Sequence, residues 1–220
     1  MDLTLAWECA GCRLAFSTAA DGDMRDPSRQ SAWLRGRHVV VPGQVHGIRI
    51  GDADAGSELA GCDGLVTRNP NCGVGVFGAD CPGLVLIAPD ALGAAHCGWR
   101  GTAGGIVGAL AAVLAARSRH PPATWSAFIG PGISGPRYVV DGPVRSARAW
   151  PPQSLDQVDA EHAHLDLATA ISADCRALGM HQITLSGLCT AGDPRLHSYR
   201  HQGRGLVQLL AVWRVIPNPA

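Results

Sequence analysis

Residues 74–96, VGVFGADCPGLVLIAPDALGAAH, contain three short apolar runs separated by turn residues. Val74 to Phe77 and Leu84 to Ala88 flank a Gly- and Pro-containing connection that carries Cys81, and Gly93 to His96 forms the third run. Short apolar runs bounded by Gly, Pro and Asp are typical of buried strands. This stretch therefore predicts three consecutive strands, with Cys81 on a connection and His96 at a strand end.

Outward from this stretch, the chain mixes further short strands with a few helices. One helix is predicted after Thr102 as N-cap, with Ile106 and Leu110 on its apolar face, and another over Leu165 to Leu178, ending at Gly179. The other predicted strands are Arg37–Val41, Val45–Ile50 with His46, Asp63–Thr67, Ala127–Ile129, Ile183–Leu185 and Leu206–Val215. Since helices and strands do not alternate regularly, we predict an α+β fold in a single domain over residues 1–220, with 141–163 as a loop or insertion.

Composition narrows the class of function. Eighteen basic and eighteen acidic residues cancel, which argues against a nucleic-acid partner and favours a small-molecule substrate. The start, Met1 to Glu8, lacks the basic segment of a signal peptide, and no run reaches the roughly 20 apolar residues of a membrane span, so we expect a cytoplasmic protein without a membrane partner. We expect it to be a monomer or a small homo-oligomer. The eight cysteines are interpreted as reduced thiols, including the Cys9/Cys12 pair, which has zinc-knuckle spacing but no second close pair.

Three residues could share one metal ion. His46, Cys81 and His96 each stand beside Gly or Pro at or near a predicted strand end, where side chains from separate loops can converge. Two imidazoles and one thiolate are a Zn²⁺ ligand set that leaves the fourth tetrahedral position for water, as in catalytic zinc sites. Their spacing matches no local zinc-finger rule, so the residues alone leave convergence open. His162 and His164 are interpreted as a polar surface pair.

Several short segments, in collinear order over roughly residues 40 to 215, resemble the signature blocks of one family. It is the laccase-domain family, also called multicopper polyphenol oxidases, zinc-dependent purine nucleoside phosphorylases or, for some bacterial members, peptidoglycan editing factors. The blocks are Gln44–Gly47, Asp63–Thr67, Ala79–Pro82, Ala94–Gly101, Ile129–Pro131, Tyr138–Val140, His164–Leu167, Cys189-Thr190 and His197–Arg200.

The resemblance implies a layered α/β/β/α fold with mixed β-sheets and one Zn²⁺ on His46, Cys81 and His96. It also implies phosphorolysis of purine nucleosides, with adenosine deamination as a further activity. Copper is the less favoured metal, because one two-histidine, one-cysteine site cannot supply the several copper centres of such an oxidase. The chain departs from the family pattern in a shortened, divergent region 1–36, and at Gly132, Val139 and the pair Leu196-His197, which bear on substrate choice.

Other residues receive candidate roles around the metal. Asp80 could steer or accept a proton from water or could cap its loop, and Asp63 could orient a ligand histidine or satisfy nearby backbone. Arg100 and Arg200 are candidates for binding phosphate. Gln44 and Tyr199 are candidate substrate contacts, and Trp99 or Tyr199 could stack on a purine or belong to the core.

Two alternatives use the same residues differently. Cys81 as a thiolate nucleophile with His96 as its base would make a cysteine hydrolase or amidase, suited to a muramyl peptide precursor. A zinc-stabilised binding protein without catalysis would need a fourth ligand, for which Cys97 and Cys72 are the candidates.

Overall fold

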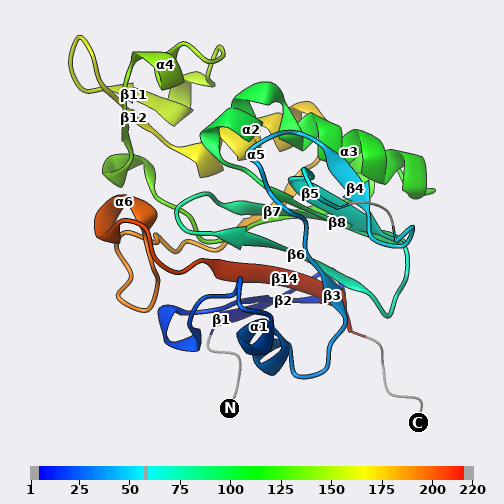
Figure 1. Ribbon diagram of the computed structural model, residues 1–220. Coiled ribbons are helices and arrows are strands. Elements are labelled where there is room, and N and C mark those ends of the chain that lie inside the picture. The colour runs from blue at the N-terminus through cyan, green and yellow to red at the C-terminus, as the bar shows by residue number, and fades with distance from the viewer. Residues whose placement is uncertain (1–4, 57–58, 216–220) are drawn as a thin grey trace.

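The computed structural model describes residues 5–56 and 59–215, so Met1–Thr4 of the predicted start lie outside the described residues. Within these residues the strands form a six-stranded, a five-stranded and a three-stranded sheet. Figure 1 shows the two larger sheets stacked on each other, with α2, α3 and α5 on one outer side and α1 on the other. The predicted α+β class, with mixed sheets in α/β/β/α layers, is confirmed.

The six-stranded sheet has the order β13-β9-β7-β8-β5-β4. Its central strands pair antiparallel, whereas β13 and β4 add in parallel at the two edges, which makes the sheet mixed. The strands are β4 (Ile50–Asp52), β5 (Gly64–Thr67), β7 (Gly83–Ala88), β8 (Ala91–His96), β9 (Ser126–Ile129) and β13 (Gln182–Leu185).

The five-stranded sheet has the order β1-β2-β14-β6-β3, with only β3 parallel to its neighbour. Its strands are β1 (Leu5–Cys9), β2 (Cys12–Phe16), β3 (Val39–Val40), β6 (Gly73–Gly78) and β14 (Gln208–Arg214). Ala10 and Gly11 both have positive φ and join β1 to β2 by the two-residue turn that suits a twisted hairpin. β14 lies between β2 and β6 and connects them.

The sheets are held together by alternating side chains, since successive residues of a strand point to opposite faces. In β14, Leu210 and Val212 enter the core between the two sheets, whereas Leu209 and Ala211 pack toward α1 (Pro27–Leu34), beside its Trp33. Both faces of the five-stranded sheet are thus covered, and α1 closes the outer one.

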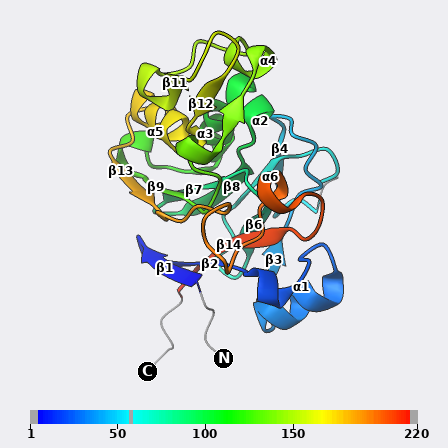
Figure 2. The ribbon, with the colours of Figure 1, turned by 90° about the vertical axis from the view of Figure 1, so that its left-hand side faces the viewer.

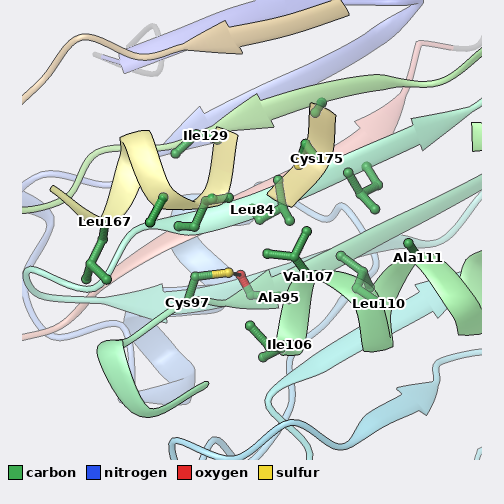
Figure 3. Packing of buried hydrophobic residues seen from close by; sticks show 14 of the residues in the cluster. Leu84, Ala95, Cys97, Ile106, Val107, Leu110, Ala111, Ile129, Leu167 and Cys175 are labelled. Atoms are coloured by element: carbon green, nitrogen blue, oxygen red, sulfur yellow. Dashed lines mark hydrogen bonds between the residues drawn. The ribbon is translucent and has the colours of Figure 1, made fainter. Parts of the chain in front are cut away.

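On the other side, helices cover the six-stranded sheet. Ile106, Val107 and Leu110 of α3 (Ile106–Arg117) pack with Leu84 and other sheet residues, and α5 (Leu167–Ala177) joins the same cluster, as Figure 3 shows. The single helix predicted after Thr102 is in fact two. α2 (Trp99–Gly104) already contains Thr102, and the chain breaks at Gly105, whose φ of 91° glycine adopts without steric cost.

The predicted strand over Val45–Ile50 is wrong. This segment has no regular structure before Ile50, because Gln44 and His46 take positive φ values of 45° and 62° that an extended strand excludes.

The predicted loop or insertion at 141–163 contains local structure. The three-stranded sheet, order β10-β12-β11, comprises β10 (Val139–Val140), β11 (Leu155–Gln157) and β12 (Ala163–Leu165), and α4 (Gly142–Arg145) precedes β11. α6 (Tyr199–Gln202) stands shortly before β14, and short 3-10 turns occupy Ala19–Asp21, Pro122–Thr124, Gly135–Arg137 and Pro152–Ser154.

Candidate metal centre

The structure brings the three predicted metal ligands together from separate elements. His46 lies in the loop between β3 and β4, Cys81 in the connection from β6 to β7, and His96 at the end of β8. One ligand atom from each lies within 4.8 Å of the other two, and the imidazole rings of His46 and His96 meet edge to face at 4.7 Å. Zn²⁺ sites use these donor types at about 2.0–2.3 Å from the ion, and the three atoms lie near enough to converge on one ion.

The Asp63 carboxylate, fully buried just before β5, organises two of the ligands. Its two oxygens accept hydrogen bonds from the backbone N–H groups of Val45 (3.0 Å), His46 (2.8 Å) and Gly47 (2.7 Å). Asp63 Oδ1 also lies 3.1 Å from Nδ1 of His96. One carboxylate therefore fixes the left-handed turn that carries His46 and the orientation of the His96 ring, as carboxylates beside metal-binding histidines do.

Charges within the group favour the ionised thiol. Burial alone raises the pKa of Cys81, but hydrogen bonds and charge from His46 and His96 outweigh burial and lower the pKa to about 7. Burial likewise lowers the pKa of His96, while contacts with Asp63 and Cys81 raise it to about 9. Burial raises the pKa of Asp63, yet the His96 ring and the backbone donors bring it down to about 2. A thiolate is the form of cysteine that binds metals.

A glycine leaves room for the ligands. A Cβ on Gly98 would lie 3.0 Å from Sγ of Cys81 and 3.2 Å from Cδ2 of His46. Gly98 has φ −66°, which any residue can adopt, so the requirement for glycine here comes from close approach rather than from backbone freedom.

Asp80, next to Cys81, links the metal loop to α6. Its Oδ1 accepts a hydrogen bond from the Thr190 hydroxyl (2.6 Å) and its Oδ2 accepts one from the backbone N–H of Arg200 (2.7 Å). The residue has φ 94°, and its carbonyl accepts a further bond from Ile133 N–H (2.8 Å). Figure 2 shows α6 beside the ends of β6 and β14, where this link forms.

The three ligands line a cavity of about 490 Å³ that is open to solvent. This volume lies within the range of small-molecule sites. Three exposed arginines, Arg100, Arg200 and Arg204, are among the residues on its wall. Arg100 stacks on Trp99 at 4.4 Å, and Arg200 stacks on Tyr138 at 5.0 Å while donating to the Val139 carbonyl (2.9 Å).

All the predicted substrate residues border this cavity, although their free groups differ. Tyr199 is 53% exposed and stands outside the core, whereas Trp99 is half-buried and packs against the helix–sheet core while bordering the cavity. Gln44 uses its side-chain amide on the backbone of Phe77, accepting from its N–H (2.7 Å) and donating to its carbonyl (3.0 Å). Gln44 therefore secures the end of β6 rather than offering its amide to a ligand.

Sequence reasoning missed two polar residues of the cavity wall, Tyr138 and Arg204. Tyr138 belongs to a segment noted only as a family block, and its place before β10 is set by pairing with β12, far along the chain. Arg204 follows α6 without any local pattern that marks it as a site residue.

The cysteines proposed as a fourth ligand point elsewhere. Cys97 is fully buried and its thiol donates toward the Ala95 carbonyl (3.6 Å) inside the helix–sheet core, as Figure 3 shows. Cys72 donates to the Gly73 carbonyl (3.3 Å). Over residues 5–56 and 59–215, His46, Cys81 and His96 are the one group found that could hold a metal, and all eight thiols are free.

Gly132, Val139 and His197, which depart from the family pattern, are not among the residues that line the cavity. Gly132 bridges to Cys189, and a Cβ there would lie 2.9 Å from the Asp80 carbonyl. Val139 supplies the carbonyl that holds Arg200, and His197 Nε2 lies 3.2 Å from the Gly203 carbonyl. These residues support the segments that carry the wall.

The fold and this site define a layered α/β protein with a candidate metal centre opening into a small-molecule cavity, an arrangement typical of metal-dependent enzymes. Residues 24–213 match the family described as multi-copper polyphenol oxidoreductase laccase, and the chain belongs to that family.

Similar proteins carry the name purine nucleoside phosphorylase. One from Deinococcus radiodurans is 34% identical, with 93% of this chain and 88% of the relative covered. YlmD from Geobacillus stearothermophilus is 32% identical over 74% of this chain and 66% of its own length. The crystal structure of that YlmD superposes with a TM-score of 0.84 at 26% identity, covering 94% of this chain and 93% of the other. NMB0706 from Neisseria meningitidis, 20% identical, shares the fold with a TM-score of 0.85 over 96% of this chain and 98% of its own.

Among the described residues, no helix combines the length and apolar character needed to cross a bilayer.

Proposed function

We propose that this protein is a zinc-dependent purine nucleoside phosphorylase. The observation that carries the proposal is the position of the His46–Cys81–His96 group on the wall of a cavity that three arginines also line. The relatives named purine nucleoside phosphorylase support the same reaction.

The arginines supply the phosphate-binding side of the site. Arg100, Arg200 and Arg204 surround the cavity with positive charge, and a planar guanidinium can hold a phosphate through two parallel hydrogen bonds. Arg200 is fixed at three points, by Asp80 at its N–H, by the Val139 carbonyl at its guanidinium and by the Tyr138 ring. Such fixation places charge before the substrate arrives, and thereby reduces the cost of ordering it.

The remaining wall suits a purine nucleoside. Ile133, Leu167 and Val207 give apolar surface, and Trp99 and Tyr199 offer rings on which a base can stack. We assign Asp63 and Asp80 as positioning residues, because every oxygen of both carboxylates already accepts a hydrogen bond from a site segment.

His46, Cys81 and His96 would hold the Zn²⁺, which would supply a polarised water with a pKa lowered to about 7. The same chemistry suits adenosine deamination, which we include as a second activity. We favour zinc over the copper in the family's name, because the described residues supply one His₂Cys group and no second site.

The test is metal analysis combined with turnover of inosine and adenosine, with and without phosphate. We expect one zinc per chain and phosphate-dependent release of hypoxanthine from inosine. Cys81→Ser should lose both the zinc and the activity, and inosine formed from adenosine would report the deaminase reaction.

Two outcomes would overturn the proposal. Nucleoside cleavage that survives thorough chelation but not Cys81→Ser would point to the thiolate nucleophile of a cysteine hydrolase. If the zinc-loaded protein turns over no nucleoside, the alternative functions would be favoured, namely a hydrolase of a muramyl peptide precursor or a binding protein. A surface variant of similar size, Ser146→Ala, is the matched control, since Ser146 is exposed and lies outside the cavity wall.

A further inference from the structure

Tyr138 presents a rigidly held side chain to the cavity. It lies between the turn at Gly135–Arg137 and β10, and its side chain lines the same wall as Cys81 and Arg200. Its N–H donates to the Gly135 carbonyl (2.9 Å) and its carbonyl accepts from Leu165 N–H (3.0 Å), so the backbone is fixed on both sides. The residue as a whole is only 9% exposed.

The hydroxyl of this buried residue has no protein partner within the described chain. No hydrogen bond joins it to residues 5–56 or 59–215, and it is not among the sealed polar atoms left without a partner. Because Tyr138 lines this cavity, its unbonded and unsealed hydroxyl is placed to open into it. Burial, with the charge of nearby Cys81, raises the pKa of Tyr138 to about 12, which keeps the hydroxyl a donor at neutral pH.

We propose that the Tyr138 hydroxyl donates a hydrogen bond to the purine base as that base leaves during phosphorolysis, an inference that rests on the proposed function. In that reaction an oxygen of HPO₄²⁻ bonds to C1′ of the ribose while the C1′–N9 bond breaks and its electron pair stays on the purine. The phosphate proton ends on the purine, and the products are ribose 1-phosphate and the free base. Tyr138 keeps its own proton throughout and stabilises the charge that develops on the base, most directly at N7.

Other polar groups on the wall are less suited to this task. Both oxygens of Asp80 are already occupied as acceptors, by the Thr190 hydroxyl and the Arg200 N–H. The Gln44 amide is occupied by Phe77. The three guanidiniums match the dianionic phosphate, whereas a neutral donor in a buried position matches a base that needs a hydrogen bond without a full countercharge.

The experiment compares Tyr138→Phe with the wild type on two substrates, inosine and 7-methylinosine, using zinc-loaded protein and saturating phosphate. The methyl group blocks N7 and makes the purine a good leaving group without a hydrogen-bond donor. For inosine, we expect kcat/KM to fall about 100-fold, the usual loss for one donor to a developing charge. For 7-methylinosine, we expect a change of less than about threefold.

Zinc content and thermal midpoint are measured on the same samples, so that an effect of the missing hydroxyl can be told from a loss of folded structure. Ser146→Ala is the control in which a hydroxyl is deleted outside the cavity. An equal fall on both substrates, or no fall on inosine, would overturn the role of Tyr138 while leaving the phosphorylase intact. A wild-type protein that cleaves neither nucleoside would instead overturn the proposed function, and the inference with it.

Discussion

Replacing Asp63 by Asn should damage both the fold and the metal centre. Oδ1 of Asp63 accepts from His46 N–H and contacts His96 Nδ1, while Oδ2 accepts from Val45 N–H and Gly47 N–H. An asparagine keeps one acceptor oxygen and places an NH₂ group at the other position. In the Oδ2 position the NH₂ faces the N–H donors of Val45 and Gly47, and in the Oδ1 position it faces the His46 N–H and Nδ1 of His96, which is a donor when the ring is protonated, all in a fully buried place.

The cost follows from that count. Each buried donor left without a partner costs about 1–3 kcal/mol, so two of them predict a loss of roughly 2–6 kcal/mol in the free energy of unfolding. At about 2–4 °C per kcal/mol for a chain of this size, the thermal midpoint should fall by at least about 4 °C. Because the same oxygens orient His46 and His96, zinc affinity should fall about 10- to 100-fold.

Urea unfolding of the metal-free protein and competition with a chromophoric chelator measure the two effects. Asp159→Asn is the matched control, because its carboxylate also accepts from two backbone N–H groups, at Glu161 (2.8 Å) and His162 (2.7 Å), but is 55% exposed. We expect the control to cost under about 1 kcal/mol, since water can replace the lost bonds. An Asp63→Asn protein as stable as the control, with unchanged zinc affinity, would refute the assignment of Asp63 as the organiser of the site.

Three further results are expected. Gly98→Ala should weaken zinc binding about 10-fold in chelator competition, because the added methyl group crowds Cys81. Gly108→Ala in α3, where a Cβ meets open space, should keep the zinc affinity and raise the unfolding free energy by about 0.5–1 kcal/mol. Equal zinc affinity in the two variants would contradict this prediction. In metal-free protein at pH 7.5, iodoacetamide should label Cys81, whose pKa is about 7, but not buried Cys97, whose pKa is raised well above 9. Zinc should protect Cys81 from labelling, as measured by mass spectrometry of the peptides. Equal labelling of Cys81 with and without zinc would count against the metal site. The pKa of Tyr138 is about 12 in the folded protein against 10 in the unfolded chain, so folding holds this proton more tightly. The stability of the wild type relative to Tyr138→Phe should therefore be full below pH 10 and fall by roughly 2–3 kcal/mol as the pH rises toward 12. A stability difference in urea unfolding that stays flat from pH 9 to 11.5 would contradict it.

Much of the central sheet could be predicted from the sequence, because its strands are continuous apolar runs between turn residues. β7 and β8 match the predicted runs closely, since both faces of that sheet are buried and few polar residues interrupt them. The strand predicted around His46 failed for a reason local sequence does not contain. Val45 and Ile48 look strand-like, yet they are 62% and 45% exposed, and the turn between them is held by Asp63, far along the chain.

The candidate site, like the fold, could be predicted only in part from the sequence. The three ligands could be proposed from their residue types and their positions beside Gly or Pro, and the family resemblance joined them into one group. Tyr138 could not, because its side chain reaches the cavity only through the pairing of β10 with β12 and the stacking of Arg200 on its ring. Asp80 could be read equally as a proton acceptor or a turn residue until Thr190 and Arg200 were found on its two oxygens.

The position of β14 has a consequence for how the chain acquires its shape. The β1–β2 hairpin reaches the rest of its sheet only through β14, which is made about 190 residues later, so the hairpin must wait without a partner during synthesis. Tyr199, Arg200 and Arg204 come just before that strand. These residues of the cavity wall are therefore made just before the strand that closes the sheet, and a nascent chain stopped short of β14 would lack that closure. Such distant pairing predicts slow folding, on the order of milliseconds to seconds.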